Sequence, residues 1–168
     1  MSESAVAARA TAESPAALTY ILFTVAGTTY ALKSEQVLHM EMLDHVTPVP
    51  NAPAFVEGVV FSRGQVVPVI NLRARFGFDR IGTTLRSRLL VVQHEARRVG
   101  LLADDAREFI RIPADAIKPP HEAVGGMSGN YLQGVAMIGE RIVLILDVSA
   151  LSRTVRHRSR SAIDGVSA

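Results

Sequence analysis

The feature that most restricts the fold of this chain is a series of short β-branched runs, with turn residues between them about every 8–12 positions. Tyr20–Val25 and Thr29–Leu32 flank a short turn and predict one hairpin. Glu57–Phe61 and Gln65–Leu72 flank Ser62-Arg63-Gly64 and predict another. Strands this short and this regularly spaced are typical of an all-β barrel or sandwich.

The second half of the chain repeats this plan. Leu101-Leu102 lies 70 positions after Ala31-Leu32, and farther along the spacing is 76, as between Asn71 and Asp147. The Gly-rich stretch Val124–Asn130 supplies the six additional residues. Asn71 and Asp147 each end an apolar run and are expected to cap a short helix. Each half has about 65 residues and about five strands, so the halves should share a core. Chance likeness among aliphatic strands is the alternative.

Composition excludes several classes of protein. The chain has no cysteine, which excludes disulfides, Cys-ligated metals and thiol catalysis. No run of 18 apolar residues is present, so no membrane insertion is expected. Basic and acidic side chains balance within residues 18–152, and the excess of Arg lies in 153–168. A neutral body is not expected to bind nucleic acid, although the Arg-rich tail keeps a small nucleic-acid-binding barrel as an alternative.

Residues that could carry catalysis or bind a cofactor are few. Asp104-Asp105 could serve acid–base chemistry, but the position predicts the exposed start of a helix. His39 and Glu41 share a strand face and permit a metal pair, yet a third ligand at fixed spacing is missing. The Gly-rich loop 125–130 has no Gly-Lys-Ser/Thr ending and is expected to be a flexible connection between strands. No enzyme activity, metal or cofactor is predicted.

One stretch is specific enough to suggest a family. Gly58–Arg73 reads GVVFSRGQVVPVINLR and closely resembles the signature of the CheW family, a G-V-x-N-L-R-G turn followed by V-P-V-I-D-L-R. Asn51–Val56, Val99–Asp104 and Tyr131–Val135 are similar to further segments of that family, in the same order. The likeness covers about residues 18–152.

The resemblance implies a mainly β fold of two intertwined, pseudo-repeated SH3-like barrels of five strands, with a shared core and a few short helices. The first barrel would span about 18–83 and the second about 84–150, between a disordered leader at 1–17 and a mobile basic tail at 153–168. It also implies a cytoplasmic, non-catalytic adaptor at membrane-associated receptor arrays. Its partners would be the cytoplasmic tip of a chemoreceptor and the regulatory domain of a CheA-type histidine kinase. A non-flagellar chemosensory pathway is the alternative setting.

The resemblance further implies a receptor-binding groove, which would comprise Val37, His39, Arg63 and Arg88, with Gly58 and Gly64 supporting its turn. Position 39 is His where Glu is common in the family, and position 88 is Arg where Val is common. Phe61-Ser62 replaces the usual Asn-Leu. Arg63 is expected at the tip of a hairpin, where its planar guanidinium could bind carboxylate or carbonyl oxygens of a receptor helix.

Overall fold

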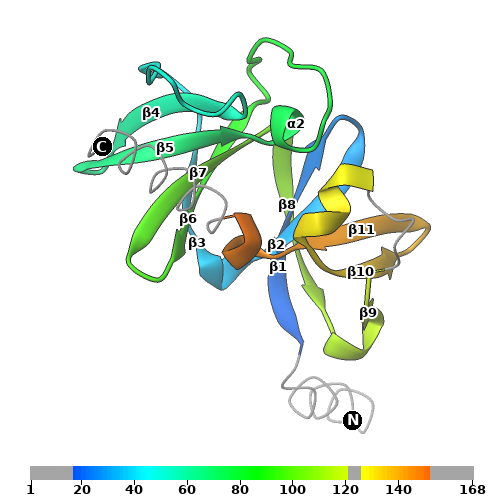
Figure 1. The fold of residues 1–168 in the computed structure, drawn as a ribbon. Helices are drawn as coiled ribbons and strands as arrows, with labels where there is room; N and C mark the ends of the chain where they lie inside the picture. The colour runs from blue at the N-terminus through cyan, green and yellow to red at the C-terminus, as the bar shows by residue number, and fades with distance from the viewer. Residues whose placement is uncertain (1–16, 121–125, 152–168) are drawn as a thin grey trace, which may run out of the picture.

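The computed structural model describes residues 17–120 and 126–151. The predicted leader, apart from Ala17, and the predicted basic tail lie outside these residues. Strands dominate the described part of the chain, which forms two sheets (Figure 1). The prediction of a mainly β fold with a few short helices is therefore confirmed. None of the helices in the described ranges is long and apolar enough to span a membrane.

The larger sheet has six strands, of which only β2 and β11 pair in parallel. Its strand order is β8 (Asp105–Ile112), β1 (Leu18–Val25), β2 (Thr28–Lys33), β11 (Arg141–Leu146), β10 (Leu132–Ile138) and β9 (Ile117–Lys118).

The smaller sheet has five strands, and here β5 and β7 form the parallel pair. Its order is β3 (Val37–Glu41), β6 (Arg88–His94), β7 (Arg97–Ala103), β5 (Gln65–Asn71) and β4 (Val56–Ser62). The short helices that connect strands are η1 (Ser34–Gln36), α2 (Leu72–Arg75), η2 (Ala114–Ala116) and η3 (Gly126–Tyr131).

The predicted duplication is visible in the strands themselves. β4 and β10 begin and end 76 positions apart, and β1 begins 70 positions before β6. When each strand of the smaller sheet is replaced by its repeat equivalent, the order β3-β6-β7-β5-β4 becomes β8-β1-β2-β11-β10, which is the order of five of the six strands of the larger sheet, with β9 added at its edge. The two sheets are thus two copies of one plan.

The strands of each sheet come from both sides of the expected boundary between residues 83 and 84. β1 and β2 join the larger sheet with β8 to β11, while β6 and β7 complete the smaller sheet with β3 to β5. The halves have therefore exchanged their first hairpins, as the green β6 and β7 beside the cyan β3 show in Figure 1. Pairing between strands far apart in sequence decides this exchange, and a hydrophobic pattern within one strand cannot report it.

Both predicted helix caps are present at equivalent positions. Asn71 Oδ1 accepts a hydrogen bond from the Ala74 N–H at 3.1 Å, and Asp147 Oδ1 accepts one from the Ser149 N–H at 2.9 Å. Residues 148–151 are helical, as α2 is after Asn71. Each cap satisfies a backbone donor that the first turn of a helix leaves without a partner.

The core has three parts. The largest cluster of buried side chains draws on both sheets and contains Phe23, Tyr30, Ile70, Leu101 and Leu144, among others. A smaller cluster lies on the other face of the strands of each sheet. The predicted shared core is therefore confirmed, because the largest apolar cluster is built by strands from both halves.

One expectation about local structure was wrong. Asp104-Asp105 does not begin a helix, because Asp105 starts β8, whose backbone pairs with β1 along the edge of the larger sheet. In this segment the surrounding structure overrides a weak local preference. The Gly-rich loop does connect two strands, β9 and β10, and it includes η3.

Candidate functional site

Arg63 lies at the tip of the β4–β5 hairpin, as predicted. Ser62 and Gln65 are the last paired residues, and Arg63 and Gly64 form the turn with φ angles of 48° and 81°. Positive φ at both central residues is the geometry of a tight hairpin turn whose twist matches that of its strands. Gly adopts this conformation without strain, so Gly64 supports the turn. Arg63 is exposed at this tip.

His39 lies on β3 but is not an exposed residue of a groove. Its side chain is only 7% exposed, and Nε2 lies 3.0 Å from Ser62 Oγ and 3.0 Å from Glu41 Oε2. The Ser62 hydroxyl donates to the same Glu41 oxygen at 3.1 Å. We call these three side chains the β3–β4 cluster. Because Ser62 directly precedes Arg63, the cluster connects the middle of β3 to the hairpin tip.

Sequence reasoning missed Ser62 as a member of this site. It did recognise that His39 and Glu41 share a strand face, which their contact confirms. A small polar residue in an otherwise apolar strand, at a position where the related family has Leu, is the signal that could have identified Ser62. In the structure Ser62 is a buried polar residue, 5% exposed.

The two remaining residues predicted for the groove lie near opposite ends of β6: Val37 is on the adjacent β3 and Arg88 is on β6 itself. Val37 pairs with Val92, is half-buried and packs against the largest core cluster. Arg88 begins β6, one position before Leu89, the partner of Glu41. Its Nη1 donates to the carbonyl oxygens of Leu85 at 2.7 Å and Ser87 at 2.8 Å, so the guanidinium folds back over the preceding loop. The structure therefore places His39 in contact with Ser62, the residue before Arg63, whereas it gives neither Val37 nor Arg88 such a contact with the hairpin tip.

Gly58 allows the segment around Thr47 to pair with the outer edge of β4. The Thr47 N–H donates to the Val59 carbonyl and the Val59 N–H donates to the Thr47 carbonyl, both at 2.8 Å. Gly58 has a φ of 144°, and a Cβ at this position would collide with the Thr47 carbonyl. Glycine is thus required for the close approach of this segment to β4, and the hairpin that carries Arg63 is held along both strands.

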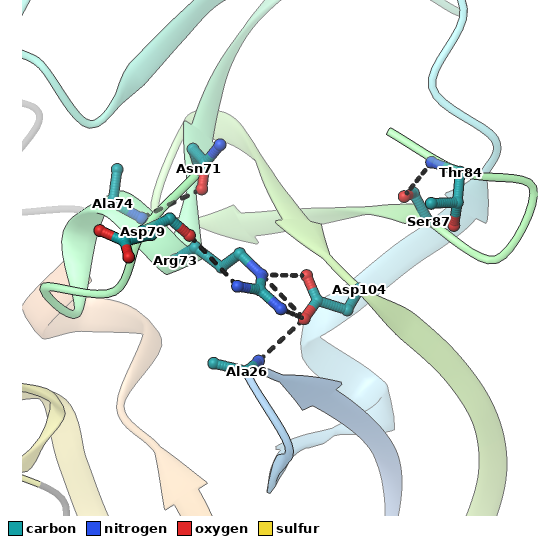
Figure 2. Close-up of polar contacts among 8 residues, drawn as sticks. All are labelled: Ala26, Asn71, Arg73, Ala74, Asp79, Thr84, Ser87 and Asp104. Atoms are coloured by element: carbon teal, nitrogen blue, oxygen red, sulfur yellow. Dashed lines mark hydrogen bonds and ion pairs between the residues drawn. The ribbon is translucent and has the colours of Figure 1, made fainter. Parts of the chain in front are cut away.

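A second polar cluster connects the two sheets (Figure 2). Arg73, on α2, donates from Nε to both carboxylate oxygens of Asp104 at 2.9 and 3.0 Å, and its Nη2 lies 2.9 Å from Oδ2. The same Oδ2 accepts the backbone N–H of Ala26, in the turn between β1 and β2, at 2.8 Å. The hydrogen bonds that Arg73 donates to the Asp104 carboxylate raise the pKa of its guanidinium. Arg73 and Asp104 therefore fasten the smaller sheet to the first hairpin of the larger one.

No group of three or more His, Cys, Asp or Glu side chains that could hold a metal ion occurs in residues 17–120 and 126–151. The predicted His39–Glu41 pair has Ser62 as its third member, and a serine hydroxyl is not a typical zinc ligand. Ser62 and His39 do not form the relay of a serine hydrolase, because Glu41 contacts the same ring nitrogen as Ser62. In that relay the carboxylate binds the other ring nitrogen.

Comparisons with known proteins agree with this structure. The family profile described as a CheW-like domain matches residues 19–156. Chemotaxis protein CheW of Klebsiella aerogenes is 28% identical over 132 residues, which cover 79% of this chain and 80% of that protein. Protein FrzA of Myxococcus xanthus is 33% identical over 145 residues, which cover 83% and 88%.

A solved structure shares the fold. The scaffolding protein TtCheW from Thermoanaerobacter tengcongensis superimposes with a TM-score of 0.73 at 27% sequence identity, over 78% of this chain and 89% of that one. The duplicated two-sheet architecture, the Arg63 hairpin and the extent of these matches lead to one conclusion: the chain belongs to the CheW-like domain family.

Proposed function

We propose that this CheW-like scaffold couples the cytoplasmic tip of a chemoreceptor to the regulatory domain of a CheA-type histidine kinase, and that it catalyses no reaction. The proposal places the protein in the cytoplasm, at membrane-associated receptor arrays. The receptor would bind the groove beside Arg63, with Val37, His39 and Arg88 as its other members.

The observation that carries the receptor site is the presentation of Arg63. Its guanidinium is exposed on a turn whose two strands are fixed by pairing with each other and by the Thr47 bridge. A rigid backbone reduces the entropy that binding must overcome. The planar donor fork suits carboxylate or carbonyl oxygens, and the apolar stem can pack on the partner.

The test is binding of the purified receptor cytoplasmic fragment from the same organism to Arg63→Glu. We expect at least a tenfold loss of affinity, about 1.4 kcal/mol, with an almost unchanged melting temperature. Arg97→Glu is the matched control, because Arg97 is exposed at the start of β7, by the neighbouring hairpin tip, and undergoes the same charge change. Wild-type affinity of Arg63→Glu would contradict the groove assignment.

The kinase needs a surface that stays free when the receptor is bound. Met137 and Ile142 are cross-strand partners near the tip of β10–β11, and they are 60% and 54% exposed. They form an apolar pair on the sheet that does not carry Arg63. Exposed apolar side chains at a defined surface are typical of protein-binding sites. We therefore place the kinase regulatory domain on this tip.

Titration calorimetry with the isolated kinase regulatory domain tests this placement. The wild-type protein should bind with micromolar affinity or tighter, as is usual for an interface that buries on the order of 1,600 Å². Absence of both heat and co-elution at tens of micromolar would contradict a kinase partner.

A second setting is an adaptor of a non-flagellar chemosensory pathway, and the similarity to FrzA accords with it. Deletion of the gene distinguishes the two settings by the type of motility or regulation that is lost. A fluorescent fusion that fails to co-localise with receptors would contradict the proposed location.

A further inference from the structure

The β3–β4 cluster has a hydrogen-bond pattern that fixes where its protons lie. Three heavy atoms form a closed triangle with sides of 3.0, 3.0 and 3.1 Å: His39 Nε2, Ser62 Oγ and Glu41 Oε2. The Ser62 hydroxyl hydrogen is donated to Glu41. A bare Nε2 would direct its lone pair at the carboxylate, so this nitrogen must carry a hydrogen that points into the triangle. All three polar groups are then satisfied together.

The cluster joins two strands that are not neighbours in the sheet. β3 and β4 are the opposite edges of the order β3-β6-β7-β5-β4. His39 and Glu41 contribute from one edge and Ser62 from the other. Ser62 is also the last residue of β4 before Arg63. The hydrogen bonds therefore fix the tip of the β4–β5 hairpin relative to the middle of β3.

The other copy of the plan shows that sheet closure does not require such a cluster. In the larger sheet, Phe109 is equivalent to His39 and Ile138 to Ser62, by the spacings of 70 and 76. Phe109 is 60% exposed and Ile138 packs against an apolar cluster. The hairpin turn there has Gly139 at the position equivalent to Arg63. The polar cluster thus occurs in the copy whose hairpin presents an arginine.

We propose that His39, Ser62 and Glu41 act as one positioning unit, which holds the Arg63 hairpin tip in the orientation that a receptor binds. The His39 and Ser62 side chains are buried and act through the hairpin, whereas the Glu41 side chain is 34% exposed and can also contact a partner. Glu41 and Ser62 thereby become members of the site, and His39 has a positioning role in place of direct contact. The proposal rests on the receptor-binding function proposed above.

The first experiment needs no partner. The chain has no cysteine, so Gln65→Cys accepts a single nitroxide label beside the turn. We expect the electron paramagnetic resonance spectrum to show at least twofold faster label motion when Ser62→Ala or His39→Leu is added. His39→Gln, which keeps an N–H donor, should restore most of the restriction. Ser149→Ala is the matched control: it removes a serine hydroxyl that is 2.8 Å from a carboxylate oxygen of Asp147 but lies outside this groove.

The second experiment measures affinity for the receptor fragment in two backgrounds. Ser62→Ala should weaken binding at least threefold when Arg63 is present and should have no effect in Arg63→Ala. An equal loss in both backgrounds would show a general structural role and overturn the proposal. Unchanged label motion in both Ser62→Ala and His39→Leu would also overturn it. Unchanged receptor binding by Arg63→Glu would instead overturn the proposed function and the receptor role of the unit, while label motion would still report whether the unit holds the tip.

Discussion

The two sheets have the same strand order but different hairpin tips. Both tips carry an exposed cross-strand apolar pair, Phe61 with Val66 and Met137 with Ile142. The smaller sheet adds the partly buried β3–β4 cluster and Arg63, whereas the larger sheet has an exposed ion pair, in which Arg141 donates to Glu108 at 2.9 and 3.1 Å. The two copies share the same arrangement of strands, and different side chains at a few equivalent positions give each copy a different surface.

The comparison also separates what the fold needs from what the site needs. Backbone pairing and apolar packing recur in both copies, so they are sufficient to form a sheet of this plan. The polar triangle occurs in the smaller sheet and not at the equivalent residues of the larger one. Burying a polar side chain costs free energy unless its hydrogen bonds are formed, so a buried hydrogen-bonded cluster restricts the segments that it joins to one arrangement.

The largest difference in stability between the two copies is expected for substitutions of a pair of equivalent glycines. Gly58 and Gly134 lie 76 positions apart, but only Gly58 has a positive φ, and a Cβ there would collide with a backbone carbonyl. The closest atom to a Cβ at Gly134 belongs to the Ile117 side chain. We expect Gly58→Ala to lower the free energy of unfolding by about 3 kcal/mol and Gly134→Ala by about 1–2 kcal/mol. Urea denaturation measures both, and equal losses would contradict this reading of the β4 edge.

The connection between the sheets predicts the next largest effect. Asp104→Ala removes the acceptor of Arg73 and of the Ala26 N–H, and it leaves a guanidinium that is 20% exposed without its carboxylate. We expect a loss of about 2–3 kcal/mol of unfolding free energy, since breaking a largely buried pair leaves one charge uncompensated. Glu108→Ala is the control from an exposed pair and should cost less than 1 kcal/mol. Similar losses for the two variants would show that Arg73–Asp104 does not fasten the sheets.

The apolar pairs should separate the two partners. Met137→Ser removes apolar surface from the tip of the larger sheet and should weaken kinase binding about tenfold, or about 1.4 kcal/mol, with receptor binding unchanged. Phe61→Ser changes the equivalent position beside Arg63 and should weaken receptor binding instead. Calorimetry of each variant with each partner checks this pattern. Loss of the same partner in both variants would contradict the division of roles between the tips.

The smallest expected effect is a dependence of stability on pH from the larger sheet. The hydrogen bond from Arg141 lowers the pKa of Glu108 from its ordinary value of 4.5. A depressed folded-state pKa means that the pair contributes stability above that value and loses it as the pH falls through the pKa of the folded state. Both side chains are more than 40% exposed, so the contribution at neutral pH should be a few tenths of a kcal/mol. Unfolding of Arg141→Ala between pH 3 and about pH 7 measures it, and an unchanged pH profile would contradict it.

Much of the architecture follows from signals within a few residues. Three features could be predicted from the sequence because each depends on local backbone geometry or on a simple pattern. They are the turn at Arg63-Gly64, the caps at Asn71 and Asp147, and the repeat spacings of 70 and 76. The position of Arg63 at an exposed tip belongs to the same group. The sequence by itself therefore determined the strands, their duplication and the exposed position of Arg63 at a hairpin tip.

Only the tertiary structure decided how these pieces meet. Pairing between distant segments decides three features of the structure. These are the exchange of hairpins between the halves, the strand that begins at Asp105 and the burial of the His39 side chain. Ser62 lies 23 positions from His39, and Arg73 lies 31 positions from Asp104. Such contacts form because the largest core brings the two sheets together and each sheet curls until its edges approach. A local sequence pattern specifies which face of a strand is apolar, but the partner across that face is fixed only when the whole chain has packed.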